Sequence, residues 1–93
     1  MSYSLEFVDQ ALAEWQKLDA TIREQFRKKL AERLINPRIP SAKLIGQKDR
    51  YKIKLRNSGY RLVYEVHDAE LIVWVIAVGK RERDAVYKAA AKR

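Results

Sequence analysis

The first part of the chain combines a short alternating segment with a segment of helical spacing. Residues 3–8 alternate loosely between apolar and polar side chains, which predicts a first strand. Over residues 9–18 the apolar side chains recur at helical spacing, and Asp9 is a candidate N-cap. We therefore expect a strand followed directly by an amphipathic helix.

A second helix is expected immediately afterwards. Thr21 and Glu24 form a capping-box pattern at its start, and apolar side chains one turn apart follow. Asn36 and Pro37 end it, because the residue before a proline disfavours helical backbone. The short gap at residues 19–20 predicts that the two helices form an antiparallel hairpin.

The hydrophobic period changes to two after a loop that we expect over residues 37–49. Basic and apolar side chains alternate over residues 50–56, which predicts a strand with one charged face and one core face. Residues 57–59, Asn-Ser-Gly, predict a hairpin turn into a second alternating strand at residues 60–67.

The last part of the chain supplies a third strand and a final helix. Residues 71–78 are apolar throughout, which indicates a central strand covered on both faces. A turn over residues 68–70 precedes this strand, and a helix is expected from about Asp84 to the end. The complete order predicts one α+β domain over residues 1–93, in which helices pack on one face of a three-stranded antiparallel meander.

Composition adds a chemical constraint to this fold. The chain has 93 residues, no cysteine and a net charge of +8. Residues 43–62 hold seven basic side chains against one acidic residue, Asp49. A clustered positive charge favours a polyanionic partner over a merely solvated surface.

Other features of the chain point to the cytoplasm. The N-terminus lacks the basic and apolar regions of a signal peptide, and the apolar run at residues 71–78 is too short to span a bilayer. The absence of cysteine fits a reducing compartment. We therefore expect a cytoplasmic protein without a membrane partner.

Several kinds of chemistry are disfavoured by the residues present. The three glycines are isolated, so the chain has no glycine-rich phosphate loop. The single histidine, His67, has no second histidine and no cysteine to share a metal, and it cannot supply an acid–base histidine pair. We expect neither a metal nor another cofactor, and a structural or solvated role for His67.

A cationic cluster remains as the candidate site. Lys52 and Lys54 lie two residues apart on one strand face, which separates them by about 7 Å. Arg61 falls on the same face if the hairpin pairs as predicted, Arg81 follows the central strand, and Tyr87 lies early in the last helix. A phosphodiester would offset the repulsion of such a cluster, although an acidic protein partner or simple solvation would also account for it.

Four segments of this region resemble the RelE toxins. They are Tyr-Lys-Ile-Lys-Leu-Arg at 51–56, Gly-Tyr-Arg-Leu-Val-Tyr at 59–64, Val-Gly-Lys-Arg-Glu-Arg at 78–83, and Val-Tyr at 86–87. Shorter matches at residues 11–15 and 23–30 extend the resemblance over nearly the whole chain. The resemblance implies a RelE/ParE-like fold.

The resemblance also implies an activity. RelE toxins are metal-independent endoribonucleases that enter the ribosomal A site and cut mRNA there, through attack of a 2′-hydroxyl on the adjacent phosphate. The products would be a 2′,3′-cyclic phosphate and a 5′-hydroxyl. The implied partners are the 70S ribosome with its mRNA, a RelB-like antitoxin that neutralises the toxin, and operator DNA reached only through the toxin–antitoxin complex.

By motif match, the resemblance places five residues in the active site: Lys52, Lys54, Arg61, Arg81 and Tyr87. Six further basic residues are expected to contact RNA or the ribosome: Lys43, Lys48, Arg50, Arg56, Lys80 and Arg83. Ile45 departs from the pattern, because many members carry a basic residue there. That difference puts one phosphate or ribosomal RNA contact in doubt.

Two alternative functions stay open. ParE-like toxins share the fold and poison DNA gyrase without nuclease activity. The presence in this chain of all five residues that match the RelE active site argues against this class. A non-catalytic module that binds RNA or an antitoxin would also be compatible with the basic residues alone.

Overall fold

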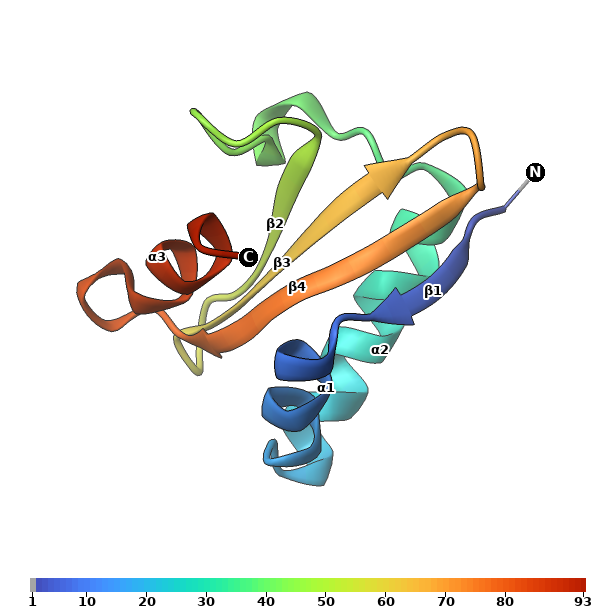
Figure 1. The fold of residues 1–93 in the computed structure, drawn as a ribbon. Coiled ribbons are helices and arrows are strands. Elements are labelled where there is room, and N and C mark those ends of the chain that lie inside the picture. The colour runs from blue at the N-terminus through green and yellow to red at the C-terminus, as the bar shows by residue number, and fades with distance from the viewer. Residues whose placement is uncertain (1) are drawn as a thin grey trace.

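The computed structural model describes residues 2–93 and has the predicted α+β order of elements (Figure 1). The elements are β1 Ser4–Phe7, α1 Asp9–Gln16, α2 Ala20–Ile35, β2 Arg50–Leu55, β3 Tyr60–His67, β4 Ile72–Lys80 and α3 Ala85–Ala91. Short 3-10 turns, η1 at Pro40–Ala42 and η2 at Glu82–Asp84, interrupt the two longer connections. No helix of the described chain is both long and apolar enough to cross a membrane.

The four strands form one sheet in the order β1-β4-β3-β2. The pairs β2–β3 and β3–β4 are antiparallel, which confirms the predicted meander. The first strand, β1, joins the sheet in parallel beside β4, with Ser4 opposite Ile72 and Phe7 opposite Val75. The apolar strand β4 therefore has a neighbour on each side, as its sequence predicted.

The helical hairpin forms, but its caps differ from the predicted ones. Asp19 is the N-cap of α2, and its carboxylate accepts a hydrogen bond from the backbone N–H of Ile22 at 3.0 Å. Thr21 lies inside the helix, because the chain turns helical two residues earlier than the capping-box pattern indicates. Asp9 is likewise the first residue of α1 rather than its cap, and the capping residue Val8 has no side-chain bond to the helix.

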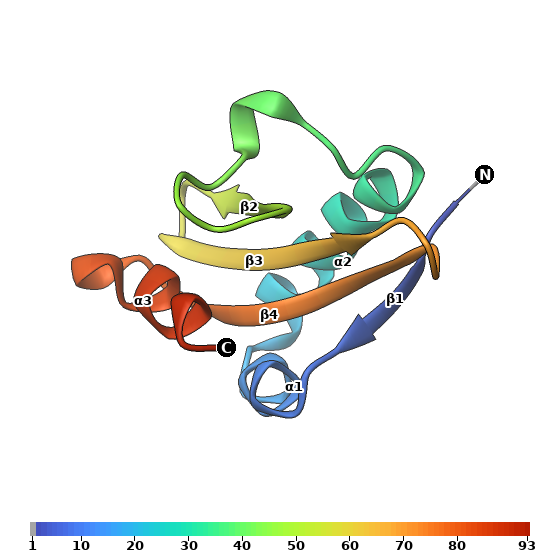
Figure 2. The ribbon, with the colours of Figure 1, turned by 45° about the horizontal axis from the view of Figure 1, so that its top comes forward.

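The helices cover both faces of the sheet, so the prediction that they pack on one face is wrong for α3 (Figures 1 and 2). The core on the α1 and α2 side includes Trp15, Phe26 and Tyr64. On the other face Val86 and Ala90 of α3 join a separate apolar cluster. That cluster is possible because β3 and β4 carry apolar side chains on both faces, as a strand buried from both sides requires.

A β-bulge in β4 enlarges the surface that α3 covers. Val63 pairs with Ala77, whereas the next residue, Tyr64, pairs with Val75, which leaves Ile76 as the extra residue. Ile76 and Ala77 therefore both belong to the α3 cluster. Strict alternation would have turned only one of them to that side.

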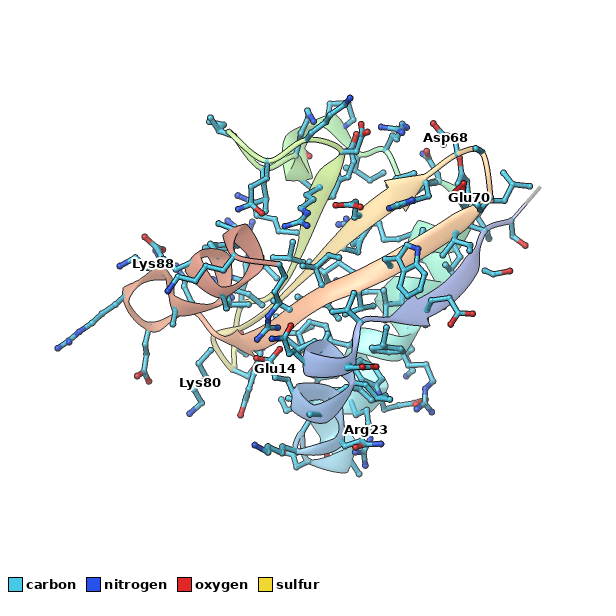
Figure 3. All side chains as sticks on the ribbon, viewed as in Figure 1. Glu14, Arg23, Asp68, Glu70, Lys80 and Lys88 are labelled. Atoms are coloured by element: carbon cyan, nitrogen blue, oxygen red, sulfur yellow. The ribbon has the colours of Figure 1, made fainter. Side chains whose placement is uncertain are left out.

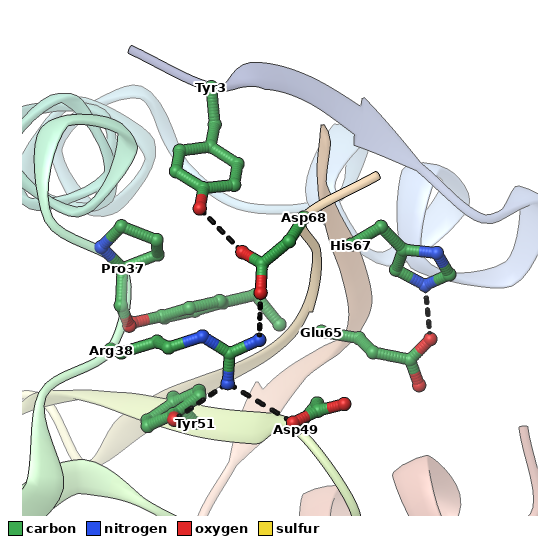
Figure 4. A network of polar contacts seen from close by, with 9 residues as sticks. Tyr3, Pro37, Arg38, Asp49, Tyr51, Glu65, His67 and Asp68 are labelled. Carbon is green, nitrogen blue, oxygen red and sulfur yellow. Dashed lines mark hydrogen bonds and ion pairs between the residues drawn. The ribbon is translucent and has the colours of Figure 1, made fainter. Parts of the chain in front are cut away.

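Arg38 fastens the loop between α2 and β2 to the turn between β3 and β4 (Figure 4). Its guanidinium donates to Asp68 at 2.8 Å and to Asp49 at 3.1 Å, and Tyr3 also donates to Asp68, at 2.5 Å. These contacts lower the pKa of the Asp68 carboxyl, chiefly through the hydrogen bond from Tyr3. The network fixes the end of the sheet that lies furthest from the candidate cationic cluster.

Candidate active site

The β2–β3 hairpin brings three of the expected site residues together. Lys54 pairs directly with Arg61, and Lys52 pairs with Val63 one step further along the ladder. Directly opposed residues share a sheet face with their Cα atoms about 5 Å apart. The expected placement of Lys52, Lys54 and Arg61 on one face is therefore confirmed.

The turn of that hairpin also positions Arg81. The Gly59 backbone is left-handed, with φ of +74°, and its carbonyl accepts a hydrogen bond from the Arg81 backbone N–H at 2.9 Å. On β4, Gly79 pairs with Arg61. Arg81 thus leaves the sheet at the same end as the hairpin turn.

The backbone beyond Arg81 is strained. Arg83 and Asp84 both adopt left-handed backbone, with φ of 52° and 57°. Such residues cost of the order of 1–3 kcal/mol each and cluster at functional sites. This strained segment turns the chain from β4 into α3, beside the cationic side chains.

These elements enclose a pocket of about 560 Å³ at the end of the sheet. The residues that line it are Arg56, Ser58, Gly59, Arg61, Lys80, Arg81, Glu82, Arg83 and Asp84. Five cations against two carboxylates leave the pocket strongly positive. We call this hollow the cationic pocket.

Arg61 is the one charged residue among the buried side chains of the described chain, with 7% of its surface exposed. One of its terminal nitrogens donates to the Tyr60 carbonyl at 2.9 Å. Its Nε is buried and has no hydrogen-bond partner within residues 2–93. A buried, unpaired donor is costly, and an anion in the pocket would relieve that cost.

The pKa of Lys54 is lowered from its usual value by the charges around it. Lys52 has the largest effect, followed by partial burial and then by Arg61, Arg56 and Arg81. A lower pKa increases the fraction of neutral amine at a given pH. Lys54 is therefore better suited to accept a proton than a lysine on an ordinary surface.

Tyr87 reaches the same side of the sheet because α3 packs there. Tyr87 is half-buried and lies against the α3 apolar cluster, but it does not line the cationic pocket. Val63, the partner of Lys52, belongs to that same cluster. The wrong prediction about the faces matters here, since a helix on the α2 side would separate Tyr87 from the basic strand.

Arg50 anchors α3 rather than projecting freely. Its guanidinium pairs with Glu65 at 2.8 Å and donates to the Ala90 carbonyl at 2.5 Å. Gln47 also donates to the Tyr87 carbonyl at 3.5 Å. Arg50 therefore has partners within the chain, whereas Arg56, Lys80 and Arg83 are exposed.

Lys43 and Lys48 lie at the other end of β2 from the pocket. They line a separate hollow of about 630 Å³ in the loop that precedes β2, together with the fully exposed Ile45. The Lys43 ammonium sits 5.4 Å from the centre of the Tyr51 ring. Five of the eleven expected site residues line the cationic pocket: Arg56, Arg61, Lys80, Arg81 and Arg83. Lys52, Lys54 and Tyr87 lie outside its lining, and Arg50 lies with Lys43 and Lys48 at the remote end of β2.

His67 lies at the same remote end of the sheet. Its ring contacts the carboxylates of Glu65 and Glu70, and the hydrogen bond with Glu65 is the main cause of a raised His67 pKa. Among the described residues, no group of three or more histidine, aspartate or glutamate side chains is placed to hold a metal ion.

Comparison with known proteins identifies the family. A family model described as the ParE toxin of a type II toxin–antitoxin system matches residues 5–85. The mRNA interferase toxin RelE of Escherichia coli K12 is 59% identical over 93 residues, which covers 100% of this chain and 98% of that protein. The chain belongs to the RelE family. A Shigella flexneri protein named mRNA interferase RelE shows the same identity and coverage.

Solved structures of RelE toxins share the fold. A mutant of E. coli RelE in the free state superposes with a TM-score of 0.92 at 57% identity, covering 100% of this chain and 98% of that one. RelE in the intact E. coli RelBE toxin–antitoxin complex gives 0.83 at 58% identity, covering 85% of this chain and 96% of that one. The RelE-like fold predicted from the motifs is confirmed.

Four pocket residues were missing from the RelE-like site predicted from sequence: Ser58, Gly59, Glu82 and Asp84. Ser58 occupies the hairpin turn, where its Oγ lies 3.3 Å from the Leu55 carbonyl. The two carboxylates flank Arg83 in the strained segment. Only their closeness in sequence to Arg61 and Arg81 could have indicated them, because no periodic pattern covers this segment.

Proposed function

We propose that this chain is an endoribonuclease toxin that cleaves mRNA in the A site of the ribosome and so inhibits translation. The observation that carries the proposal is the cationic pocket, built around a buried Arg61 with an unpaired donor and adjoined by Lys54. The full-length relatives named mRNA interferase support the same reaction class.

The proposed reaction transfers a phosphoryl group within the RNA. The 2′-hydroxyl loses its proton to Lys54 and its oxygen attacks the adjacent phosphorus, while the bond from that phosphorus to the 5′-oxygen of the next nucleotide breaks. Arg61 stabilises the added negative charge of the transition state, which is usually the largest catalytic contribution. The products are a 2′,3′-cyclic phosphate and a 5′-hydroxyl, and the reaction uses no metal or other cofactor.

The leaving oxygen also needs stabilisation. Arginine hardly ever gives up its proton, so Arg81 donates a hydrogen bond to that oxygen and water delivers the proton. Tyr87 stacks on or orients a base, and Lys52 adds positive charge beside Lys54. Arg56, Lys80 and Arg83 bind the RNA backbone around the pocket.

Dependence on the ribosome follows from these weak acid–base groups. An enzyme without a good acid relies strongly on holding its substrate in line for attack, and the ribosome supplies that geometry. Lys43 and Lys48 are placed to contact ribosomal RNA from the remote loop, where Ile45 adds no charge.

The proposal includes regulation and location. A RelB-like antitoxin neutralises the toxin, and the complex represses its operon by binding operator DNA. Solved complexes of E. coli RelE with RelB or with a RelB peptide support this partner class. We place the protein in the bacterial cytoplasm and assign the whole activity to one domain, residues 1–93.

Expression of the toxin in bacteria tests the site. The wild type should arrest growth, and the double variant Arg61→Ala/Arg81→Ala should not, because it lacks the charge that stabilises the transition state. Circular dichroism and thermal melting of the purified variant establish that it folds. Growth arrest by a folded double variant would contradict the site assignment.

A second candidate function is inhibition of DNA gyrase, favoured by the ParE description of the family model that matches residues 5–85. A supercoiling assay with purified gyrase distinguishes the two functions. Strong inhibition at stoichiometric toxin would favour the gyrase function, and unaffected supercoiling is expected of the nuclease.

A further inference from the structure

A second hollow adjoins the cationic pocket on the other side of edge strand β2. It has a volume of about 680 Å³ and lies between α2 and the end of the β2–β3 hairpin. Its lining residues are Ile22, Gln25, Lys28, Lys29, Glu32, Lys54, Leu55, Arg56, Asn57 and Ser58. Arg56 and Ser58 also line the cationic pocket, so the two hollows are adjacent.

A third hollow extends the path along α2. It has a volume of about 330 Å³, and it shares Lys29 and Glu32 with the second hollow. Together they form a channel, which we call the α2 trough, defined by Gln25, Lys28, Lys29, Glu32, Lys54 and Arg56. The helix α2 that borders the trough lies on the face of the sheet opposite α3 (Figure 2).

The α2 side of the trough has helical periodicity. Gln25, Lys28, Lys29 and Glu32 are spaced at i, i+3, i+4 and i+7, so their side chains share one helix face. From β2, Lys54 borders the trough at the edge of the sheet, and its side chain shares the sheet face of Arg61. Two elements distant in sequence, α2 and β2, thus border one hollow.

The charge of the trough is not balanced within the chain. Its four cations, Lys28, Lys29, Lys54 and Arg56, face one acidic residue, Glu32. Within residues 2–93 none of the four has a carboxylate at ion-pair distance. Like charges placed this close together are unfavourable until an anion joins them.

We infer that the α2 trough binds the phosphate backbone of an RNA strand that continues beyond the cationic pocket. The inference rests on the proposed function and extends it, by naming a second RNA-binding surface on α2. No aromatic side chain lines the trough, so bases have no platform for stacking there. Lysines grip phosphates as point charges and read no sequence.

An acidic protein segment fits the trough less well. Its apolar floor consists of Ile22 and Leu55, which are only 9% and 6% exposed. A docked peptide helix would need an apolar groove for its anchoring side chains. The shared residues Arg56 and Ser58 instead connect the trough directly to the site where RNA is cut.

Two sources of RNA backbone have the same chemistry. One is the mRNA strand that leaves the cleaved codon, and the other is ribosomal RNA that faces the toxin. The test variant is Lys28→Gln/Lys29→Gln, because glutamine keeps the helix propensity of lysine and removes its charge. The matched control is Lys17→Gln/Lys92→Gln, which removes two charges from exposed C-cap positions of α1 and α3, outside the trough.

Binding is measured in two arms between about 50 and 200 mM salt. The first arm uses a single-stranded 2′-O-methyl RNA oligonucleotide, which cannot be cleaved, and the second uses vacant ribosomes. We expect the trough variant to bind roughly tenfold more weakly at low salt, with a salt slope smaller by about 1.4, or about 0.7 for each lost phosphate contact. The control should behave like the wild type.

The arms identify the source of the RNA. Weaker binding to the oligonucleotide assigns the trough to the mRNA strand, and weaker binding to ribosomes alone assigns it to ribosomal RNA. A trough variant that matches the control in both arms overturns the inference. Unchanged RNA binding with weaker capture of a purified RelB-like antitoxin also overturns it, in favour of an acidic protein segment.

Cleavage of a translated message by the wild type is measured in parallel. If the wild type makes no cuts, the proposed function fails, while the oligonucleotide arm still decides whether the trough binds RNA. The two failures are therefore distinguishable.

Discussion

At the scale of single residues, Arg61 in the cationic pocket and Lys54, its partner on β2, have different roles in the proposed reaction. Arg61 is buried and its Nε has no hydrogen-bond partner within residues 2–93, so this N–H is available to donate to a bound anion. Lys54 is exposed, and its pKa is lowered mainly by Lys52. In the proposed reaction, Arg61 stabilises the negative charge of the transition state, and Lys54 accepts the proton of the 2′-hydroxyl.

The pH dependence of cleavage tests this assignment of roles. If Lys54 is the base, the rate rises with pH as its amine loses the proton, and it levels off above the Lys54 pKa. Because Lys52 is the largest cause of the lowered pKa, Lys52→Gln should raise the Lys54 pKa and move the rising limb to higher pH. Single-turnover cleavage on programmed ribosomes gives the profile.

The position of the limb, rather than the maximal rate, is the readout for Lys52→Gln, since this variant also loses a charge near the substrate. Lys17→Gln on α1 serves as the control and should leave the limb in place. A limb that does not move in Lys52→Gln would rule out Lys54 as the titrating base.

At the scale of elements, the N-terminus of α2 shows how local geometry decides between two capping patterns. Asp19 caps the helix through Ile22, whereas Thr21 lies within the first turn. Asp19→Ala should lower the free energy of unfolding by about 1 kcal/mol. Thr21→Ala should change it by less than about 0.5 kcal/mol. Urea denaturation measures both, and a larger loss for Thr21→Ala would contradict the assigned cap.

The attachment of α3 depends on a partly buried ion pair. The Arg50 and Glu65 side chains are 12% and 25% exposed, and Arg50 also holds the C-terminal end of α3 through the Ala90 carbonyl. Arg50→Met should therefore cost about 2 kcal/mol of stability, because Glu65 and that carbonyl lose a charged donor. Hydrogen exchange should increase first in α3.

Arg27→Met is the matched control for Arg50→Met. Arg27 pairs with Glu24 at 3.8 Å on the open surface, where both side chains are more than half exposed. Such pairs contribute little to stability. Equal destabilisation by the two variants would show that Arg50 does not clamp α3.

The limits of sequence reasoning also lie at this scale. Alternation predicted β2 and β3 closely, and it placed Lys52, Lys54 and Arg61 on one face because strand periodicity is strict. It did not predict that β1 pairs in parallel with β4, since a strand's partner depends on the crossover path through α1 and α2. It also missed the side on which α3 packs, which the bulge at Ile76 and the apolar second face of β3 determine.

Within the site, the sequence predicted where basic residues would gather better than it predicted which residues each of them would contact. Arg50 occupies the same alternating face of β2 as Lys54. Unlike Lys54, it pairs with Glu65 and donates a hydrogen bond to the Ala90 carbonyl at the end of α3. Lys28 and Lys29 were not among the expected site residues, because spacing along α2 does not reveal which face borders β2. These differences arise from tertiary packing, which no local pattern encodes.

At the scale of the whole molecule, the excess of positive charge is larger at the cationic pocket than at the opposite end of the sheet, where acidic and basic side chains are mixed. Lys80 lies at the end of β4 beside the cationic pocket, whereas Asp68 and Glu70 lie at the opposite turn (Figure 3). A molecule polarised in this way approaches an RNA surface with its basic end first. The pocket, the α2 trough and the hairpin turn all belong to that end.

Primer extension on a message translated in a purified system tests the central claim most directly. The account predicts new 5′ ends within codons when wild-type toxin meets translating ribosomes, little cutting of the same RNA without ribosomes, and no new ends with Arg61→Ala/Arg81→Ala. A translated message that the wild type binds but leaves intact would contradict the claim and indicate a non-catalytic binding module.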